Sequence, residues 1–324
     1  MKQIKTLQEV INAPREKDRD EKKSLRLLIF PLALVAQFFY ALLPSWLDGT
    51  YYDYGLLVPL LFPVFFLQRW RESNSQNAIR KGGWDAVAGA PITWVLGGLT
   101  LILVFFLRLV ELVDSGWRLP LYLHGAVVLG FCWWLLGRVM GRGAASGFLP
   151  CLILVWLSIP LPSRVEHVVI DSLTSGVTEF AVFSNRMLGL PVTRAGETLF
   201  VAGQSLQVSE GCSGIRSFQS SMFAGFVLGE FLRLGLGSRI VLFIGSLAAA
   251  FVFNSLRVVS LVQYAASHTQ AELQKLHDVS GYFSLGLTFL FVFVLARALG
   301  LTEERSANRS KKAQEASSNL PREN

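Results

Sequence analysis

Residues 240–262 read IVLFIGSLAAAFVFNSLRVVSLV and contain a single charged side chain, Arg257. An α-helix needs about 20 predominantly apolar residues to cross the hydrocarbon core of a bilayer. This stretch therefore predicts a membrane-spanning helix. A cation inside such a helix is costly unless a partner compensates its charge, so Arg257 is also a first candidate for a functional role.

Apolar stretches of this kind recur along the chain. Of its 324 residues, 52% are hydrophobic and 16% charged, and the mean hydropathy is +0.45; a soluble domain carries about a quarter charged residues. We predict an all-α polytopic membrane protein with about eight transmembrane helices, of which the second, third and fifth are short. The predicted spans are 25–43, 54–68, 92–107, 119–140, 147–161, 213–232, 240–262 and 282–299.

Basic residues gather in segments that would share one side of the membrane. Residues 1–24 and 303–324 are polar and basic, and further arginines follow the second, fourth and sixth predicted spans. The positive-inside rule then places both termini in the cytoplasm, with a transmembrane domain over 25–302. This topology accounts for the net charge of +7, so no nucleic-acid partner is expected.

One long outer segment, residues 162–211, interrupts the short loops. Its first half repeats apolar residues at a helical period with Glu166, Asp171 and Glu179 between them. This pattern predicts an amphipathic helix that lies on the outer membrane surface or packs over the bundle. In the second half, residues 198–201 and 205–208 flank a short turn, which is typical of a small β-hairpin before the sixth span.

Cys212 stands at the outer entrance of the sixth predicted span, within Gly211-Cys-Ser-Gly214. We expect Ser209 or Gly211 near the helix cap and the sulfur within the first helical turn. Unpaired amide groups and the positive end of the helix dipole would favour a thiolate at that position.

Two further candidates come from the helices that follow. Arg257 lies near the outer end of the seventh span, and Asn254, three residues earlier on the same helical face, could orient it. His277 stands in the predicted loop before the last span. We therefore expect Cys212, Arg257 and His277 to converge on the outer face from three consecutive helix ends.

The remaining polar and cysteine residues near these spans have more than one interpretation. Arg216, four residues after Cys212, could bind a substrate carboxylate or pair with Glu210. Cys132 and Cys151 are expected to be free thiols that fill space between helices. The chain contains no Cys-x-x-Cys or His-Glu-x-x-His spacing, so we expect neither a metal site nor a cofactor.

Four short motifs in this order resemble a known family: Pro160-Leu-Pro162, Glu210-Gly-Cys-Ser-Gly-Ile215, Asn254-Ser-Leu-Arg257 and His277-Asp-Val-Ser-Gly281. Over residues 25–300 the chain is similar to exosortases, which belong to the exosortase/archaeosortase family of polytopic cysteine transpeptidases. The basic tails lie outside the resemblance.

The resemblance implies a cysteine protease or transpeptidase of the plasma (inner) membrane. Exosortases process exported proteins whose C-terminal sorting signal (PEP-CTERM) combines a Pro-Glu-Pro-like motif, a membrane helix and a basic cluster. By position, Cys212 matches the nucleophile, Arg257 the essential arginine and His277 the histidine. The implied partners are these three-part tails, membrane lipid, and an acyl acceptor that is water, a glycan or a lipid. The active site would face the extracytoplasmic side.

Two other classes of function remain open from the sequence. A non-catalytic transport or export component would need a polar path through the bundle, yet the centres of the predicted spans carry almost no charge. A transferase linked to exopolysaccharide assembly would call for acidic catalytic residues or a histidine-rich outer face, and no such cluster stands out.

Overall fold

The computed structural model describes residues 29–49, 51–75, 83–114, 116–208 and 212–318. Helices dominate these ranges, and one three-stranded sheet is the β structure that they contain. The prediction of a helical protein with one small β element agrees with this part of the chain. The predicted arm over 1–24 lies outside the described residues, as do residues 319–324 of the predicted tail.

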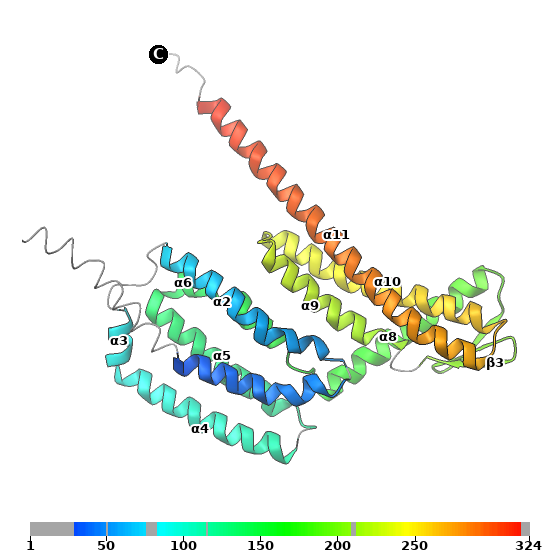
Figure 1. Cartoon of the computed structure of the whole chain (residues 1–324), viewed down its shortest axis with the longest axis horizontal. Coiled ribbons are helices and arrows are strands. Elements are labelled where there is room, and N and C mark those ends of the chain that lie inside the picture. Colours follow the sequence, from blue (N-terminus) through cyan, green and yellow to red (C-terminus); the bar gives the residue numbers. More distant parts are fainter. Residues whose placement is uncertain (1–28, 50, 76–82, 115, 209–211, 319–324) are drawn as a thin grey trace, which may run out of the picture. The chain divides into compact units, whose positions relative to one another are not determined.

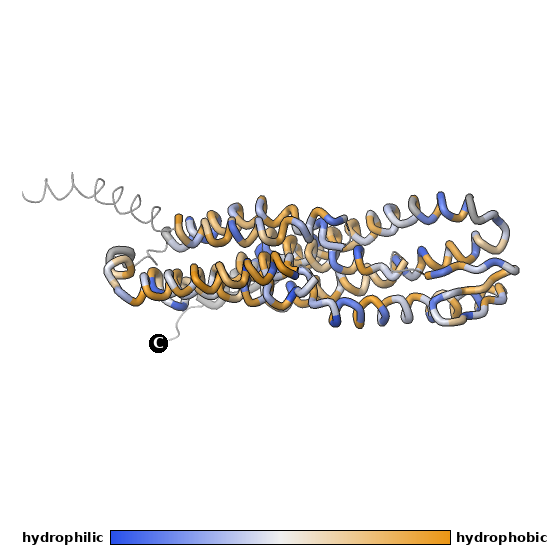
Figure 2. Tube along the Cα trace, turned by 90° about the horizontal axis from the view of Figure 1, so that it is seen from below, coloured by the Kyte–Doolittle hydropathy of each residue, from blue (hydrophilic) through white to orange (hydrophobic). Residues whose placement is uncertain are grey.

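Five of the described helices are long and apolar enough to cross a membrane, and Figure 2 shows their hydrophobic residues as long orange stretches. They correspond to the first, third, fourth, seventh and eighth predicted spans, and they identify a multi-pass membrane protein. They are the helix Ile29–Leu47, α4 (Pro91–Val113), α5 (Leu119–Met140), α10 (Leu236–Ala265) and the part of α11 (Gln270–Ser318) over Glu272–Ser306.

The other three predicted spans correspond to helices that are shorter or more charged. The second, α2 (Val58–Ser75), follows a short 3-10 helix, η1 (Asp53–Leu57), and carries Arg69, Arg71 and Glu72. The fifth is divided into α6 (Arg142–Ser146) and α7 (Leu149–Leu157), and the sixth is α9 (Ile215–Phe231). A total of eight spans, and their orientation in the membrane, stay predictions.

The third predicted span was wrongly expected to be short. The sequence predicts that this span ends at residue 107, before the charged residues Arg108 and Glu111. The helix α4 instead has 23 residues and continues to Val113. The two charges neutralise each other within the helix, because Arg108 Nη1 lies 2.6 Å from Glu111 Oε2. Glu111 Oε1 also lies 3.0 Å from Nδ1 of His124, a fully buried residue of α5. A paired and hydrogen-bonded charge costs far less to bury than an isolated one.

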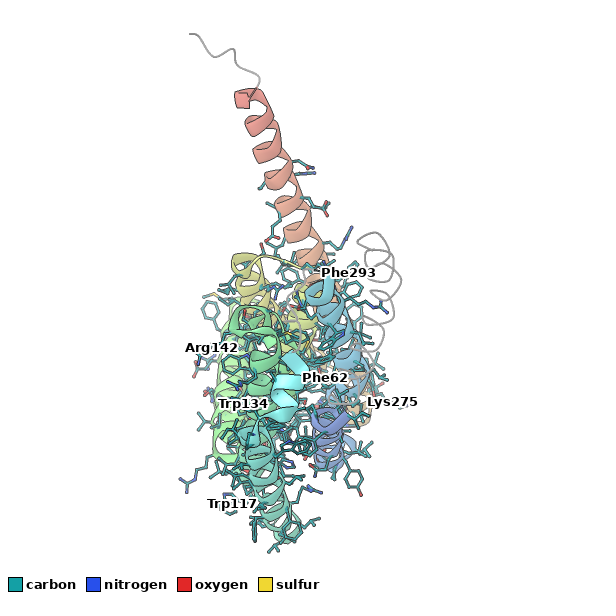
Figure 3. All side chains as sticks on the ribbon, turned by 90° about the vertical axis from the view of Figure 1, so that its left-hand side faces the viewer. Phe62, Trp117, Trp134, Arg142, Lys275 and Phe293 are labelled. Atoms are coloured by element: carbon teal, nitrogen blue, oxygen red, sulfur yellow. The ribbon has the colours of Figure 1, made fainter. Side chains whose placement is uncertain are left out.

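The described residues form two compact units, of which the first lies within Met1–Gly49 and Asp53–Ser163 and the second within Thr50–Tyr52 and Arg164–Asn324. In the first unit, Trp46 Nε1 donates to the carbonyl oxygen of Ser158 at 3.0 Å, which ties the helix Ile29–Leu47 to the end of α7. Aromatic rings fill the space around α2: the ring centroids of Phe62 and Phe66 are 5.8 Å apart, and those of Phe66 and Phe148 are 5.2 Å apart. Figure 3 draws the side chains and labels Phe62.

In the second unit, α9, α10 and α11 lie side by side (Figure 1). Small residues allow their close approach. At Gly245 of α10, an added Cβ atom would lie 2.6 Å from a methyl carbon of Leu295 of α11, and at Gly225 it would overlap Ser246 of α10. Small residues at such contacts bring helix backbones together and so increase van der Waals packing, which is the main attraction between helices in a membrane.

The segment that the sequence predicts to lie outside contains α8 (Ser163–Met187) and an antiparallel sheet of β1 (Val192–Ala195), β2 (Thr198–Val201) and β3 (Gln204–Gln207). The predicted amphipathic helix and the predicted hairpin are α8 and β2–β3. Ala202 and Gly203 connect the hairpin with φ of 48° and 81°, as the favoured two-residue turn requires. Strand β1 was not predicted, because Val-Thr-Arg-Ala has no clear alternation of apolar residues. One face of α8 joins the sheet and α10 in a common core through Val177, Ala181, Val192, Leu199 and Val258.

Two details of this unit correct the sequence analysis. Glu166, which was assigned to the polar positions of the outer helix, is only 7% exposed, and its Oε1 accepts a hydrogen bond from the Tyr52 hydroxyl at 2.8 Å. The loop expected around His277 is absent, because α11 is one helix from Gln270 to Ser318. Its last part covers residues 303–318 of the predicted tail.

Candidate active site

Cys212 lies in the turn that leads into α9. The helix begins at Ile215 and its N-cap is Gly214, with φ of 81°. The expectation that Ser209 or Gly211 caps the helix and places the sulfur in its first turn is therefore wrong. The side chain of Ser213 takes part of the capping role, since its Oγ accepts a hydrogen bond from the amide of Ile215 at 3.2 Å. Cys212 is 4% exposed.

Asn254 of α10 holds this turn in place. It is 1% exposed, and its Nδ2 donates to the carbonyl oxygen of Cys212 at 2.8 Å. The contact is close enough to demand glycine at position 214, where an added Cβ atom would lie 2.7 Å from Cγ of Asn254. The positive φ of Gly214 is a second reason for glycine there. Asn254 thus positions the backbone of Cys212, in addition to the predicted contact with Arg257.

His277 faces the sulfur from the second turn of α11. Its Nε2 lies 2.8 Å from Sγ of Cys212, close enough for direct proton transfer between them. The ring is half-buried. A regular helix therefore presents this histidine, and not the loop that the sequence predicts.

Arg257 of α10 contacts the same ring nitrogen of His277. Its Nη2 lies 3.1 Å from Nε2 of His277 and 3.1 Å from the carbonyl oxygen of the same residue. Its Nε donates to Ser280 Oγ at 3.3 Å, and its Nη1 lies 3.5 Å from Oδ1 of Asn254. The side chains of Ser280 and Asn254 therefore both contact the guanidinium. Its positive charge lies next to the Cys212–His277 pair.

Two residues of α11 were missed as contributors. Ser280 accepts from Arg257 and donates to the carbonyl oxygen of His277 at 2.9 Å. Gly281 lies against the guanidinium, and a Cβ atom there would be 3.4 Å from Nη2 of Arg257, which is an ordinary van der Waals contact. The available signal was their spacing of three and four residues from His277, which places all three residues on one face of a helix.

The structure therefore brings Cys212, Arg257, His277 and Asn254 together within the second unit. Arg216 is an exposed residue in the first turn of α9, and Glu210 lies outside the described residues. Cys132 and Cys151 are buried in the first unit, where they line a small apolar cavity with residues such as Phe62 and Phe148.

The arrangement supplies a sulfur nucleophile, a nitrogen base and a fixed cation. A sulfur in contact with an imidazole can lose its proton and attack a carbonyl carbon, and a guanidinium next to the pair can stabilise the negative oxygen that forms. Within the described ranges, no group of three or more histidine, cysteine, aspartate or glutamate side chains is placed to hold a metal ion.

Comparison with known families gives one match. Residues 46–294, more than half of the chain, match the family model for transmembrane exosortases (Exosortase_EpsH). The matched region includes the four residues of the cluster. No curated protein and no solved structure shows a significant match to the chain.

Proposed function

This chain belongs to the transmembrane exosortase family, and on that premise we propose that it is a cysteine protease or transpeptidase that cleaves C-terminal sorting signals of exported proteins. The observation that carries this proposal is the 2.8 Å contact between Cys212 Sγ and His277 Nε2, with the Arg257 guanidinium 3.1 Å from the same nitrogen. The proposed substrate is a tail that combines a Pro-Glu-Pro-like motif, a membrane helix and a basic cluster.

In the first step, the Cys212 thiol transfers its proton to His277 Nε2, and the sulfur attacks the scissile carbonyl carbon. The guanidinium has a specific part in this step. Before it, Nε2 of the neutral imidazole offers a single lone pair, for which the Cys212 thiol at 2.8 Å and Nη2 of Arg257 at 3.1 Å compete as donors. Once Nε2 is protonated, both groups are donors and carry positive charge, so this contact must open. The Nη2 hydrogen is then released toward the oxyanion at the moment when that charge develops.

In the second step, the carbon–nitrogen bond breaks and the leaving amine takes the proton from His277 Nε2. The amino-terminal part of the substrate stays on Cys212 as a thioester. An acceptor amine, hydroxyl or water then gives its proton to the neutral imidazole and attacks the thioester carbon. The Cys212 sulfur leaves as the thiolate and takes this proton from His277 Nε2, which regenerates the thiol and the neutral imidazole. A substrate anchored in the same membrane meets the site at reduced entropic cost.

The Cys212–His277 contact favours this chemistry over the two alternatives from the sequence. A transport or export component has no need of a buried thiol held against an imidazole and a guanidinium. The reactive groups that this contact joins are a thiol and an imidazole, which suit nucleophilic catalysis by cysteine and not the acid–base chemistry of paired carboxylates.

The proposed thioester can be captured directly. Full-length protein in lipid nanodiscs is mixed with a membrane-anchored substrate that carries the three-part tail, and the reaction is stopped in acid. We expect the amino-terminal fragment to be attached to Cys212, to be released by hydroxylamine, and to be located by peptide mass spectrometry. Cleavage without a hydroxylamine-sensitive adduct, in a trial fast enough to catch acyl transfer, would contradict covalent catalysis.

The proposed orientation places the active site on the extracytoplasmic face of the plasma membrane and both termini in the cytoplasm. It can be tested with single cysteines on exposed residues of the second unit, Gln207 of β3 and Glu304 of α11, in a Cys212→Ala background. We expect a membrane-impermeant maleimide to label Gln207→Cys in intact cells and Glu304→Cys only after lysis. The reverse pattern would invert the topology.

A further inference from the structure

Helix α8 has a second apolar face, which the packing of its unit leaves exposed. One face of the helix is buried in the core with β2 and α10. Near the C-terminal end of α8, however, Phe183 is 61% and Met187 72% exposed, although both are large hydrophobic side chains. Such a face on a helix of a membrane protein is suited to the boundary between acyl chains and headgroups.

A cavity of about 430 Å³ opens at this face. Phe183, Met187 and Val182 supply apolar walls, and Glu179 and Arg186 of α8 supply charge together with Arg194 of β1. The cavity therefore combines two cations with one carboxylate, and it has a net positive charge beside apolar side chains.

The two arginines are held differently. Each of the three nitrogens of Arg194 has a protein partner: Nη1 pairs with Glu179 Oε1 at 3.3 Å, Nη2 donates to Ser175 Oγ at 3.2 Å, and Nε donates to the carbonyl oxygen of Gly196 at 2.7 Å. Arg186 is anchored through Nε alone, which donates to the carbonyl oxygen of Val192 at 2.9 Å. Its two terminal nitrogens have no protein partner among the residues that the structure describes. An oriented guanidinium with both terminal nitrogens available fits a phosphate oxygen pair.

The cavity also lies level with the catalytic centre along α10. Asn185, the residue before Arg186, has its Nδ2 3.5 Å from the carbonyl oxygen of Val259, two residues beyond Arg257. A substrate whose scissile bond lies just outside its membrane helix would place that centre near the headgroup region. The cavity would then be at the depth where lipid phosphates occur.

We infer that this cavity binds the phosphate headgroup of an anionic phospholipid, with Arg186 on the phosphate and the exposed side chains of Phe183 and Met187 against the upper part of an acyl chain. The net positive charge favours an anionic over a zwitterionic headgroup. A lipid bound there would anchor the C-terminal end of α8 beside the catalytic centre. This inference rests on the membrane location of the protein and, for the depth of the cavity, on the substrate of the proposed function, but not on the cysteine chemistry.

The test is lipid binding to the full-length Cys212→Ala protein in detergent, measured by native mass spectrometry with dioleoyl phosphatidylglycerol and dioleoyl phosphatidylcholine. We expect Arg186→Gln to weaken phosphatidylglycerol binding about tenfold, because a charge-assisted bidentate contact is lost. Arg164→Gln removes the same charge from an exposed position of α8 outside the cavity and should leave binding unchanged. Glu179→Gln should strengthen binding, a direction that partial unfolding cannot produce.

Four results would overturn the inference. The first is equal phosphatidylglycerol binding by Arg186→Gln and Arg164→Gln. The second is equal binding of both lipids by the parent protein. The third is displacement of the bound lipid by soluble glycerol phosphate at comparable concentration, which would indicate a site for a free anion. Arg186-dependent binding of an acidic peptide with no lipid binding would assign the cavity to substrate instead.

Discussion

Replacing Cys212 with alanine is expected to abolish cleavage of a tail-bearing substrate, with a loss of at least about 10⁴-fold, as for other nucleophiles that act as a unit with their base. The reason is that, in the proposed mechanism, Sγ is the atom that bonds to the scissile carbonyl carbon, while His277 and Arg257 assist it. The measurement is the rate of appearance of the truncated product from full-length enzyme and membrane-anchored substrate in nanodiscs.

Cys132→Ala and Cys151→Ala are matched controls. Both side chains are as deeply buried as Cys212, both lose the same atom, and neither belongs to the cluster around His277. We expect each to retain cleavage near the parent rate. If all three variants cleaved equally well, the nucleophile assignment would be wrong. If all three were inactive, thermal unfolding of each would show whether stability or chemistry was lost.

Replacing Arg257 with alanine is expected to lower the rate of thioester formation by about 10²- to 10³-fold, the usual effect of removing one donor to a developing oxyanion. The loss should fall mainly on kcat, because the released Nη2 hydrogen serves the transition state more than bound substrate. Arg257→Lys should recover little of the rate. One ammonium group cannot at once reach His277, Ser280 and Asn254, which the guanidinium contacts now.

A merely structural role for Arg257 predicts different behaviour. The Arg257→Ala protein leaves a space of guanidinium size beside His277, so added guanidinium ion should restore part of the rate if the group acts on the oxyanion. Arg297→Ala removes an exposed arginine from α11 and should keep the parent rate. An Arg257→Ala protein with full kcat, or one with a raised KM alone, would contradict the oxyanion role.

Much of the fold followed from local patterns in the sequence. Long apolar runs such as 240–262 predict helices without knowledge of their neighbours, since a membrane imposes length and composition on each span separately. The alternation around Ala202 and Gly203 likewise predicts the β2–β3 hairpin. Features that depend on partners were missed. Strand β1 pairs with β2 through its backbone and has no apolar period of its own, and Glu166 is buried because Tyr52, far away in the chain, donates to it.

The continuation of α4 past Arg108 shows the same limit. Two charges at the end of an apolar run normally predict the end of a span, and only the contacts of Glu111 with Arg108 and His124 show that the helix can continue. The start of α11 was likewise not predictable from local sequence. The polar residues before 282 predict a loop, but they form helical turns that carry His277 to the sulfur of Cys212.

The amino-acid sequence alone determined that this is a multi-pass membrane protein of the exosortase family, and it singled out Cys212, Arg257, Asn254 and His277 as candidates, because hydrophobic runs and short motifs are local in the chain. Only the tertiary structure decided that Nε2 of His277 faces both the thiol and the guanidinium, and that Asn254 holds the cysteine backbone. Such contacts depend on the rotation and close approach of α9, α10 and α11. At the start of α9, Gly214 leaves the room that Asn254 needs, and no periodicity within a single segment encodes such a contact.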